Sequence, residues 1–184
     1  MGGSSPRHRP PPQRCAPLGH HRRDFGGPGP RRGAPRRRLA FPAREARGLR
    51  ARVIEIPERL VAEVVARARR EFPDEVCGWL AGRAGRVERT YPVANAAEDR
   101  RSAFVMDPEA QLRTMRAIRE AGLELTGTYH SHPRTPSYPS SKDRQLARYP
   151  DSAHLIVSLA GVEPEIHCYR ITEEGNHPVE VSIR

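Results

Sequence analysis

Residues 123–143 read LELTGTYHSHPRTPSYPSSKD, and this stretch predicts a strand, a loop and a helix in succession. The strand is predicted from Leu123 to His130. Pro133 has no N–H to donate to a strand ladder, so a loop rich in Pro, Ser and Thr is expected after it. A short helix, closed off by a proline, is predicted over residues 140–149.

Two histidines lie where this strand ends. Successive strand residues point to opposite faces, so His130 and His132 are predicted to leave on one face while Ser131 points to the other. That spacing suits a metal ion shared by two imidazoles. Either histidine alone is more simply interpreted as a solvated polar residue at a strand end. The other polar residues nearby favour the metal site.

Asp143 follows Ser140 by three residues, and the pair has two interpretations. It is an ordinary helix-capping arrangement, with serine at the N-cap and an acid three positions later. Alternatively, the helix start brings Asp143 back toward the histidines as a third ligand and leaves the Ser140 hydroxyl facing a substrate carbonyl. A donor that stabilises a developing oxyanion in this way contributes about 3 kcal/mol. The sequence leaves both interpretations open.

Glu75 is predicted at a junction between a helix and a strand, and it is either a surface acid or a catalytic one. Two nitrogens and one oxygen from His130, His132 and Asp143 would fill three of the four tetrahedral positions of zinc. The fourth position would then hold a water. Glu75 is the candidate general base that takes a proton from this water and delivers it to a leaving amine.

The rest of residues 51–184 intersperses helices among short strands, which predicts a mixed α/β or α+β sheet flanked by helices. Helices are predicted over residues 57–72 and 107–121, the second with a buried stripe of Leu112, Met115 and Ile118. The strands are predicted over residues 53–56, 77–81, 86–93, 123–130, 154–159, 165–171 and 179–183.

Other potentially reactive side chains are assigned to the core. His154 and His167 lie in apolar-flanked strands and are interpreted as core residues or as groups that support the ligands. Cys77 is interpreted as a small buried residue. The three cysteines, Cys15, Cys77 and Cys168, form neither an even set nor a CxxC pair, so no disulfide framework is predicted and a reducing cytoplasm is expected.

The charge of the chain divides it into two parts. Residues 1–50 contain 13 Arg against one Asp and one Glu, a net charge of +11, together with nine Pro and eight Gly. This composition predicts a disordered extension. Its arginine runs could touch nucleic acid or an anionic membrane, but a plain unstructured extension is the simpler interpretation. Residues 51–184, with 19 basic and 20 acidic residues, are predicted to form one domain without a polyanion-binding surface.

Glu75, the run from His130 to Pro133, Ser140 and Asp143 together resemble the JAMM motif, also called MPN-plus, of zinc isopeptidases. Residues 73–82, PDEVCGWLAG, are similar to the segment around the catalytic glutamate of that family. Within the family, the chain most resembles the compact actinobacterial Mec type, which hydrolyses a cysteine adduct from the C-terminus of a ubiquitin-like sulfur carrier. The resemblance covers about residues 52–172.

The resemblance implies a JAB/MPN-like fold, related to cytidine deaminases, and one zinc ion per chain. It implies that His130, His132 and Asp143 are zinc ligands, Glu75 the general acid and base, and Ser140 the oxyanion donor. It also implies a cytoplasmic hydrolase that acts on a sulfur-carrier protein ending in Gly-Gly, releasing cysteine in sulfur metabolism.

Two alternative functions remain open from the sequence. A broader peptidase of the same family would act on another carrier or on a small peptide. A non-enzymatic binding module, tethered to nucleic acid by the basic extension, belongs to a different class. Removing residues 1–50 separates these, since only the binding module depends on them.

Overall fold

The computed structural model describes residues 53–147, 149 and 152–184. The Arg-rich segment for which disorder is predicted lies outside the described residues. So does Pro150, which was expected to close the short helix. All five candidate site residues lie within the described part.

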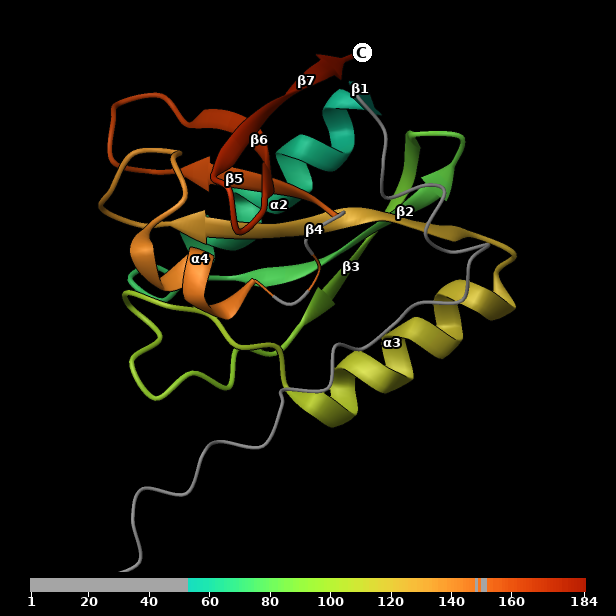
Figure 1. The fold of residues 1–184 in the computed structure, drawn as a ribbon, viewed down its shortest axis with the longest axis horizontal. Helices are drawn as coiled ribbons and strands as arrows, with labels where there is room; N and C mark the ends of the chain where they lie inside the picture. Colours follow the sequence, from blue (N-terminus) through green and yellow to red (C-terminus); the bar gives the residue numbers. More distant parts are fainter. Residues whose placement is uncertain (1–52, 148, 150–151) are drawn as a thin grey trace, which may run out of the picture. The chain divides into compact units, whose positions relative to one another are not determined.

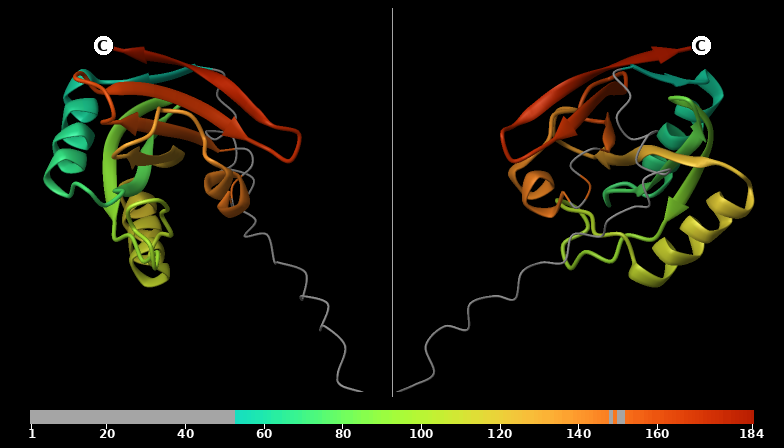
Figure 2. Two further views of the ribbon diagram at one scale, coloured as in Figure 1. Left: turned by 90° about the vertical axis from the view of Figure 1, so that its left-hand side faces the viewer. Right: turned by 45° about the vertical axis from the view of Figure 1, so that its right-hand side comes forward.

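Seven strands of the described chain form one mixed sheet that closes on itself in the order β1-β3-β2-β4-β5-β6-β7. Figures 1 and 2 show its strong curvature. Pairs β1·β7, β1·β3 and β4·β5 are parallel, and the others are antiparallel. The strands are β1 (Val53–Ile56), β2 (Cys77–Arg83), β3 (Arg86–Val93), β4 (Glu124–His132), β5 (Ala153–Ser158), β6 (Glu165–Ile171) and β7 (Asn176–Ile183).

Within the described residues, three helices accompany the sheet: α2 (Glu58–Arg70), α3 (Pro108–Glu120) and the short α4 (Ser141–Leu146). The N-cap of α3 is Asp107, whose side chain accepts a hydrogen bond from Ala110 N, and Pro108 follows it as the sequence predicts. The predicted mixed sheet flanked by helices is therefore confirmed.

The helices α2 and α3 cover different faces of the sheet (Figures 1 and 2). The apolar stripe of α2, which includes Leu60 and Val64, packs in one cluster with Leu80 of β2. The next residue back along β2, Trp79, points the other way and packs in a second cluster with Ile118 of α3. Because both faces of the central strands are covered, all but the first residue of β4 are buried.

The predicted buried stripe of α3 is only partly right. Ile118 is 2% exposed and Met115 packs partly buried against the second cluster, but Leu112 is 59% exposed. Helical periodicity indicates which residues share a face of a helix, but not how far the sheet extends beneath it. Leu112 lies on the predicted face but is not covered.

Strand β4 is longer than predicted, because it continues through His132. His132 pairs with Ser158 of the parallel strand β5, and its carbonyl accepts a hydrogen bond from Leu159 N at 2.9 Å. The ladder ends at Pro133, which has no backbone N–H to donate. Both histidines therefore lie in the strand itself, on a rigid element.

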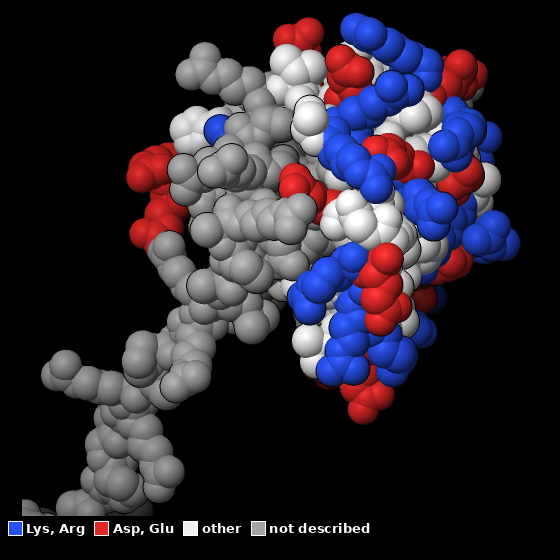
Figure 3. Space-filling view, turned by 90° about the vertical axis from the view of Figure 1, so that its right-hand side faces the viewer, with Lys and Arg blue, Asp and Glu red and all other residues white. Residues whose placement is uncertain are grey.

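Charges of both signs are interspersed on the face drawn in Figure 3. This agrees with the nearly balanced charge of residues 51–184, 19 basic against 20 acidic. None of the helices in the described residues is both long and apolar enough to cross a membrane.

Candidate metal centre

Strand β4 brings two imidazoles together at its carboxyl end. The Nε2 atoms of His130 and His132 lie 3.1 Å apart, and both residues are buried. The residue between them faces the other way: Ser131 Oγ accepts a hydrogen bond from Val76 N at 2.9 Å. The predicted alternation along the strand is therefore confirmed.

Asp143 reaches the two imidazoles from the first turn of α4. Its Oδ1 lies 3.5 Å from His130 Nε2, and its Oδ2 lies 3.3 Å from His132 Nε2. Asp143 is 5% exposed. One ligand atom from each of these residues lies within 4.8 Å of the other two, which makes a group of three that could hold a metal ion.

The hydrogen bonds of His132 leave Nε2 as the ring atom that can bind a cation. His132 Nδ1 lies 2.7 Å from Pro136 O, and because a carbonyl can only accept, Nδ1 carries the proton. In the neutral ring Nε2 then presents a lone pair, and it does so toward the lone pairs of Asp143 Oδ2. A shared cation turns this repulsion into attraction, so the donor set of His130, His132 and Asp143 fits a divalent metal such as zinc.

The pKa values of the three side chains reflect their burial and their proximity. Burial lowers the pKa of His130. Burial acts in the same direction on His132, but its hydrogen bonds to Asp143 and Pro136 outweigh it and raise the pKa. For Asp143, burial is likewise outweighed by hydrogen bonds with both imidazoles, and its pKa lies well below the usual range.

Glu75 lies two residues before the start of β2, next to the histidines across the continuation of the β2·β4 ladder. Cys77 is paired with His130, so the antiparallel register continues to place Glu75 opposite His132. Two hydrogen bonds support this continuation: Val76 N donates to Ser131 Oγ at 2.9 Å, and Ser131 N donates to Val76 O at 3.0 Å. Residues opposite each other on antiparallel strands share a face, so Glu75 is on the side of the imidazoles.

The Glu75 carboxyl is buried and incompletely satisfied. It is 5% exposed, and its Oε2 has no hydrogen-bond partner among the described residues. Burial raises the pKa of Glu75 to about 7, although the nearby His132 acts in the opposite direction. A carboxyl with a pKa near neutrality and a free oxygen is suited to exchange a proton with water.

Ser140 caps α4, as one of the two interpretations of the sequence predicts. Its Oγ accepts a hydrogen bond from Asp143 N at 3.1 Å, and its N–H donates to Asp143 Oδ2 at 2.7 Å. This capping box also fixes the Asp143 carboxylate at the imidazoles. The Ser140 hydroxyl uses a lone pair for the cap, and its proton can still be donated to another acceptor. The cap and the proposed oxyanion donor are therefore compatible with the same geometry.

We expect the metal-free Glu75→Gln variant to be more stable than the wild type at pH 8, by about 3 kcal/mol. The folded pKa of about 7 exceeds the ordinary 4.5, so ionising the buried carboxyl costs stability as the pH rises through 7. Below pH 4.5 the carboxyl is neutral in both states and the difference should vanish. Urea unfolding of chelated protein at both pH values measures it, with Glu180→Gln on the exposed surface as the control. If Glu75→Gln differed from wild type in unfolding free energy by the same amount at both pH values, the raised pKa of Glu75 would be contradicted.

Some residues at the site were not anticipated from the sequence. The Phe104 ring stacks on His130, with centroids 4.5 Å apart and an angle of 25° between the planes. The Asn95 amide donates to the carbonyl of Glu75 at 2.9 Å. No local pattern marks either residue, because each contact joins segments far apart in the chain.

The two remaining strand histidines differ from each other. His154 is 4% exposed, as predicted for a core residue, and its Nδ1 lies 3.0 Å from Thr128 Oγ1. Burial lowers the pKa of His154 to about 4. The prediction of a core position for His167 is wrong: it is exposed on β6, where its Nδ1 lies 2.6 Å from Ser137 Oγ. The apolar neighbours of His167 alternate with it along the strand and face inward.

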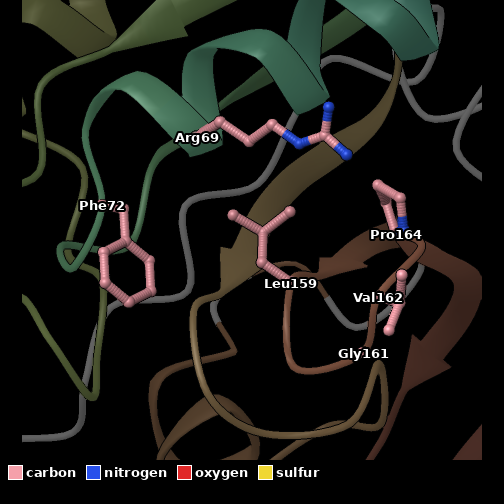
Figure 4. Close-up of a pocket in the computed structure, with 6 residues that line it drawn as sticks. All are labelled: Arg69, Phe72, Leu159, Gly161, Val162 and Pro164. Carbon is pink, nitrogen blue, oxygen red and sulfur yellow. The ribbon is translucent and has the colours of Figure 1, made fainter.

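A groove of about 280 Å³ lies between the end of α2 and the loop that joins β5 to β6 (Figure 4). Leu159 in its wall donates its N–H to the main-chain oxygen of His132, so the groove reaches the backbone at the end of β4. On its rim the guanidinium of Arg134 lies 5.3 Å from the centre of the Phe72 ring. The lining residues are Arg69, Phe72, Leu159, Gly161, Val162 and Pro164.

Comparison with known families gives a match over most of the described domain. Residues 57–172 match the family described as prokaryotic homologs of the JAB domain, Prok-JAB. The solution structure of protein DSY2949 from Desulfitobacterium hafniense is similar, with a TM-score of 0.66 and 35% sequence identity. That likeness covers 71% of this chain and 92% of the other.

Two curated relatives are similar in sequence. The CysO-cysteine peptidase of Mycobacterium tuberculosis is 40% identical over 134 residues, which are 70% of this chain and 91% of that protein. The desampylase of Haloferax volcanii is 43% identical over 91 residues, which are 48% of this chain and 66% of that protein.

Proposed function

Because the chain belongs to the Prok-JAB family, we propose that it is a zinc-dependent hydrolase of ubiquitin-like sulfur carriers. It cleaves the amide bond after the C-terminal Gly-Gly of the carrier and releases cysteine. The observation that carries this proposal is the meeting of His130, His132 and Asp143 beside a buried Glu75. Residues 51–184 form the catalytic domain, and residues 1–50 are an extension that catalysis does not need.

His130 and His132 would hold the zinc through their Nε2 atoms, and Asp143 would hold it through its carboxylate. Pro136 O fixes the tautomer of His132, and the capping hydrogen bond from Ser140 N orients Asp143. When bound, zinc supplies a Lewis acid that makes water acidic enough to lose a proton near neutral pH.

Glu75 moves the proton during hydrolysis. Its carboxylate removes a proton from the attacking water as the oxygen bonds to the glycine carbonyl carbon. Breaking the C–N bond then requires a proton on the leaving amine, and protonated Glu75 delivers it. The products are the carrier with a free carboxyl group and the free amine, so Glu75 ends in its starting state. The pKa of about 7 suits a group that must both take and give a proton.

Ser140 stabilises the carbonyl oxygen as it gains negative charge. Its Oγ already accepts from Asp143 N, so the hydroxyl proton is the part left to donate to the substrate. A cap on a rigid helix start holds this donor in place before the substrate arrives.

Burial of the site supports a slender substrate. His130, His132, Asp143 and Glu75 are each no more than 5% exposed. A Gly-Gly tail has no side chains, so it can approach such a site in an extended form where other sequences clash. The names of the relatives, a CysO-cysteine peptidase and a desampylase, support a protein carrier as the owner of that tail.

The test uses purified protein and a sulfur carrier that ends in Gly-Gly-Cys. Mass spectrometry should show the loss of one cysteine, chelator should stop the reaction, and added zinc should restore it. A lysine isopeptide conjugate of the same carrier is run in parallel. Cleavage of that conjugate alone would overturn the cysteine adduct as substrate, and chelator-insensitive cleavage would overturn the metal mechanism. Removing residues 1–50 should leave the rate unchanged.

We expect Ser140→Ala to lower kcat by about 10²–10³-fold, as the loss of an oxyanion donor does elsewhere. It should also cost about 1 kcal/mol of stability through the lost cap. Ser140→Thr keeps the hydroxyl and should recover most of the activity. The matched control is Ser141→Ala, at the neighbouring exposed serine. If Ser140→Ala lost stability but kept kcat, the serine would be a cap and nothing more.

A further inference from the structure

The loop of residues 94–107, between β3 and α3, holds the main chain of Glu75 on both sides. Glu75 N donates to Arg100 O at 2.7 Å, and Glu75 O accepts from the Asn95 side-chain amide at 2.9 Å. Asp74, the preceding residue, pairs with Arg100 at 3.2 Å. We name this segment the clasp loop. Glu75 precedes the first residue of β2, so these hydrogen bonds replace the ladder that fixes residues further along.

Asn95 organises the clasp loop with every hydrogen-bonding group of its amide. Its Nδ2 donates to Ala103 O at 3.1 Å as well as to Glu75 O. Its Oδ1 accepts from Ala97 N at 3.0 Å and from Val105 N at 3.1 Å. One side chain therefore ties both limbs of the loop to the glutamate.

The clasp loop also touches the proposed zinc ligands and their support. Phe104, within it, stacks on the His130 ring. Asp99 lies 3.6 Å from Lys142 Nζ, and Lys142 also hydrogen-bonds Ser102. Because Lys142 directly precedes Asp143, the loop spans the region from Glu75 to the start of α4 (Figure 1). The clasp loop therefore contacts both Glu75 and the elements that carry the proposed zinc ligands His130 and Asp143.

The Glu75 side chain cannot supply this placement alone. Its buried Oε2 has no hydrogen-bond partner among the residues described, so that oxygen does not anchor the carboxyl group. The main chain at Glu75 then determines where the carboxyl lies. Displacing a catalytic group by about 1 Å is enough to cost roughly 100-fold in rate.

We propose that Asn95 is a positioning residue for the reaction: its amide donates to the Glu75 carbonyl and so holds the Glu75 peptide, and through it the carboxylate, at the attacking water. This inference rests on the proposed function, because it takes Glu75 as the general base. The hydrogen bonds of the Asn95 side chain go to main-chain groups of Glu75, Ala97, Ala103 and Val105, so its role is to position Glu75.

The informative variant is Asn95→Asp. It keeps an acceptor for Ala97 N and Val105 N but loses both donors, so it releases Glu75 while leaving the loop turn in place. We expect kcat to fall by about 10- to 100-fold, with KM within about threefold of wild type. Zinc content should stay at one per chain. Asn95→Ala, which adds no charge, should lower kcat in the same way. The matched control is Asn176→Asp at the start of β7, which should be unchanged.

A double variant separates positioning from a general effect on the fold. If Asn95 acts through Glu75, then adding Asn95→Asp to Glu75→Gln should not lower the residual single-turnover rate further. Asn95→Asp also loses the bond to Ala103 O, which ties down the limb of the loop that carries Arg100. Because Glu75 N donates to Arg100 O, amide hydrogen exchange at Glu75 should become faster in Asn95→Asp than in wild type. The inference fails if Asn95→Asp keeps kcat within twofold, or if its loss is equally large beside Glu75→Gln.

Failure of the proposed function can be distinguished from failure of the Asn95 inference. If wild-type protein cleaves no carrier adduct, the substrate assignment fails, and hydrogen exchange still tests the clasp. Unchanged exchange at Glu75 in Asn95→Asp would then overturn the inference without any activity measurement.

Discussion

Glu75→Gln should retain zinc while kcat falls by about 10²–10⁴-fold, the usual contribution of a positioned general acid and base. Glutamine has nearly the shape of glutamate, so the buried position beside His132 stays filled. It cannot take a proton from water or return one to the leaving amine. Binding of the carrier tail does not depend on that proton, so KM should change little.

The measurement pairs steady-state kinetics on a carrier-cysteine adduct with zinc analysis of the same preparation. Glu180→Gln, on the exposed side of β7, makes the same chemical change away from the site and should behave as wild type. Turnover of Glu75→Gln at the wild-type rate would mean that another group carries the proton.

His132→Ala and Asp143→Asn should each abolish stable zinc binding, and nearly all activity should be lost with the zinc. Removing a supporting partner of a ligand already costs 10–100-fold in metal affinity, so removing a ligand should cost more than about 100-fold. His132→Ala leaves two donors where the candidate site has three, and Asp143→Asn replaces the one anionic donor with a neutral amide oxygen. Titration with zinc against a competing chelator gives the affinity.

The control for the ligand variants is His177→Ala, at an exposed position on β7. It should keep zinc and activity. If His132→Ala kept wild-type zinc affinity, the three converging side chains would not be the binding site. Excess zinc should partly restore Asp143→Asn, because its cap and its shape are preserved while its charge is lost.

Local sequence patterns predicted the elements well but not how they are joined. The alternation at His130 and His132 and the cap at Asp107 depend on neighbouring residues, and the structure has both. Closure of the sheet through the parallel β1·β7 pair depends on residues over 100 positions apart, and no local pattern encodes it. Leu112 shows the same limit, because its exposure is decided by where α3 sits on the sheet.

The grouping of His130, His132 and Asp143 could be predicted from the sequence because the residue types and their spacing are distinctive. The pattern of Ser140 and Asp143 was compatible with both a cap and a metal ligand, and the structure has the capping geometry at the imidazoles. The role of Asn95 could not be predicted in this way. An asparagine before a turn predicts the local bond from Ala97 N, but its bond to Glu75 O requires the fold.

We propose that His130, His132 and Asp143 together bind one zinc ion. The most direct measurement is X-ray absorption at the zinc edge on protein purified without added metal, with the zinc content of the same sample. We expect one zinc per chain, with only nitrogen and oxygen neighbours at about 2.0–2.2 Å. Absence of tightly bound zinc, or sulfur neighbours at about 2.3 Å, would contradict it.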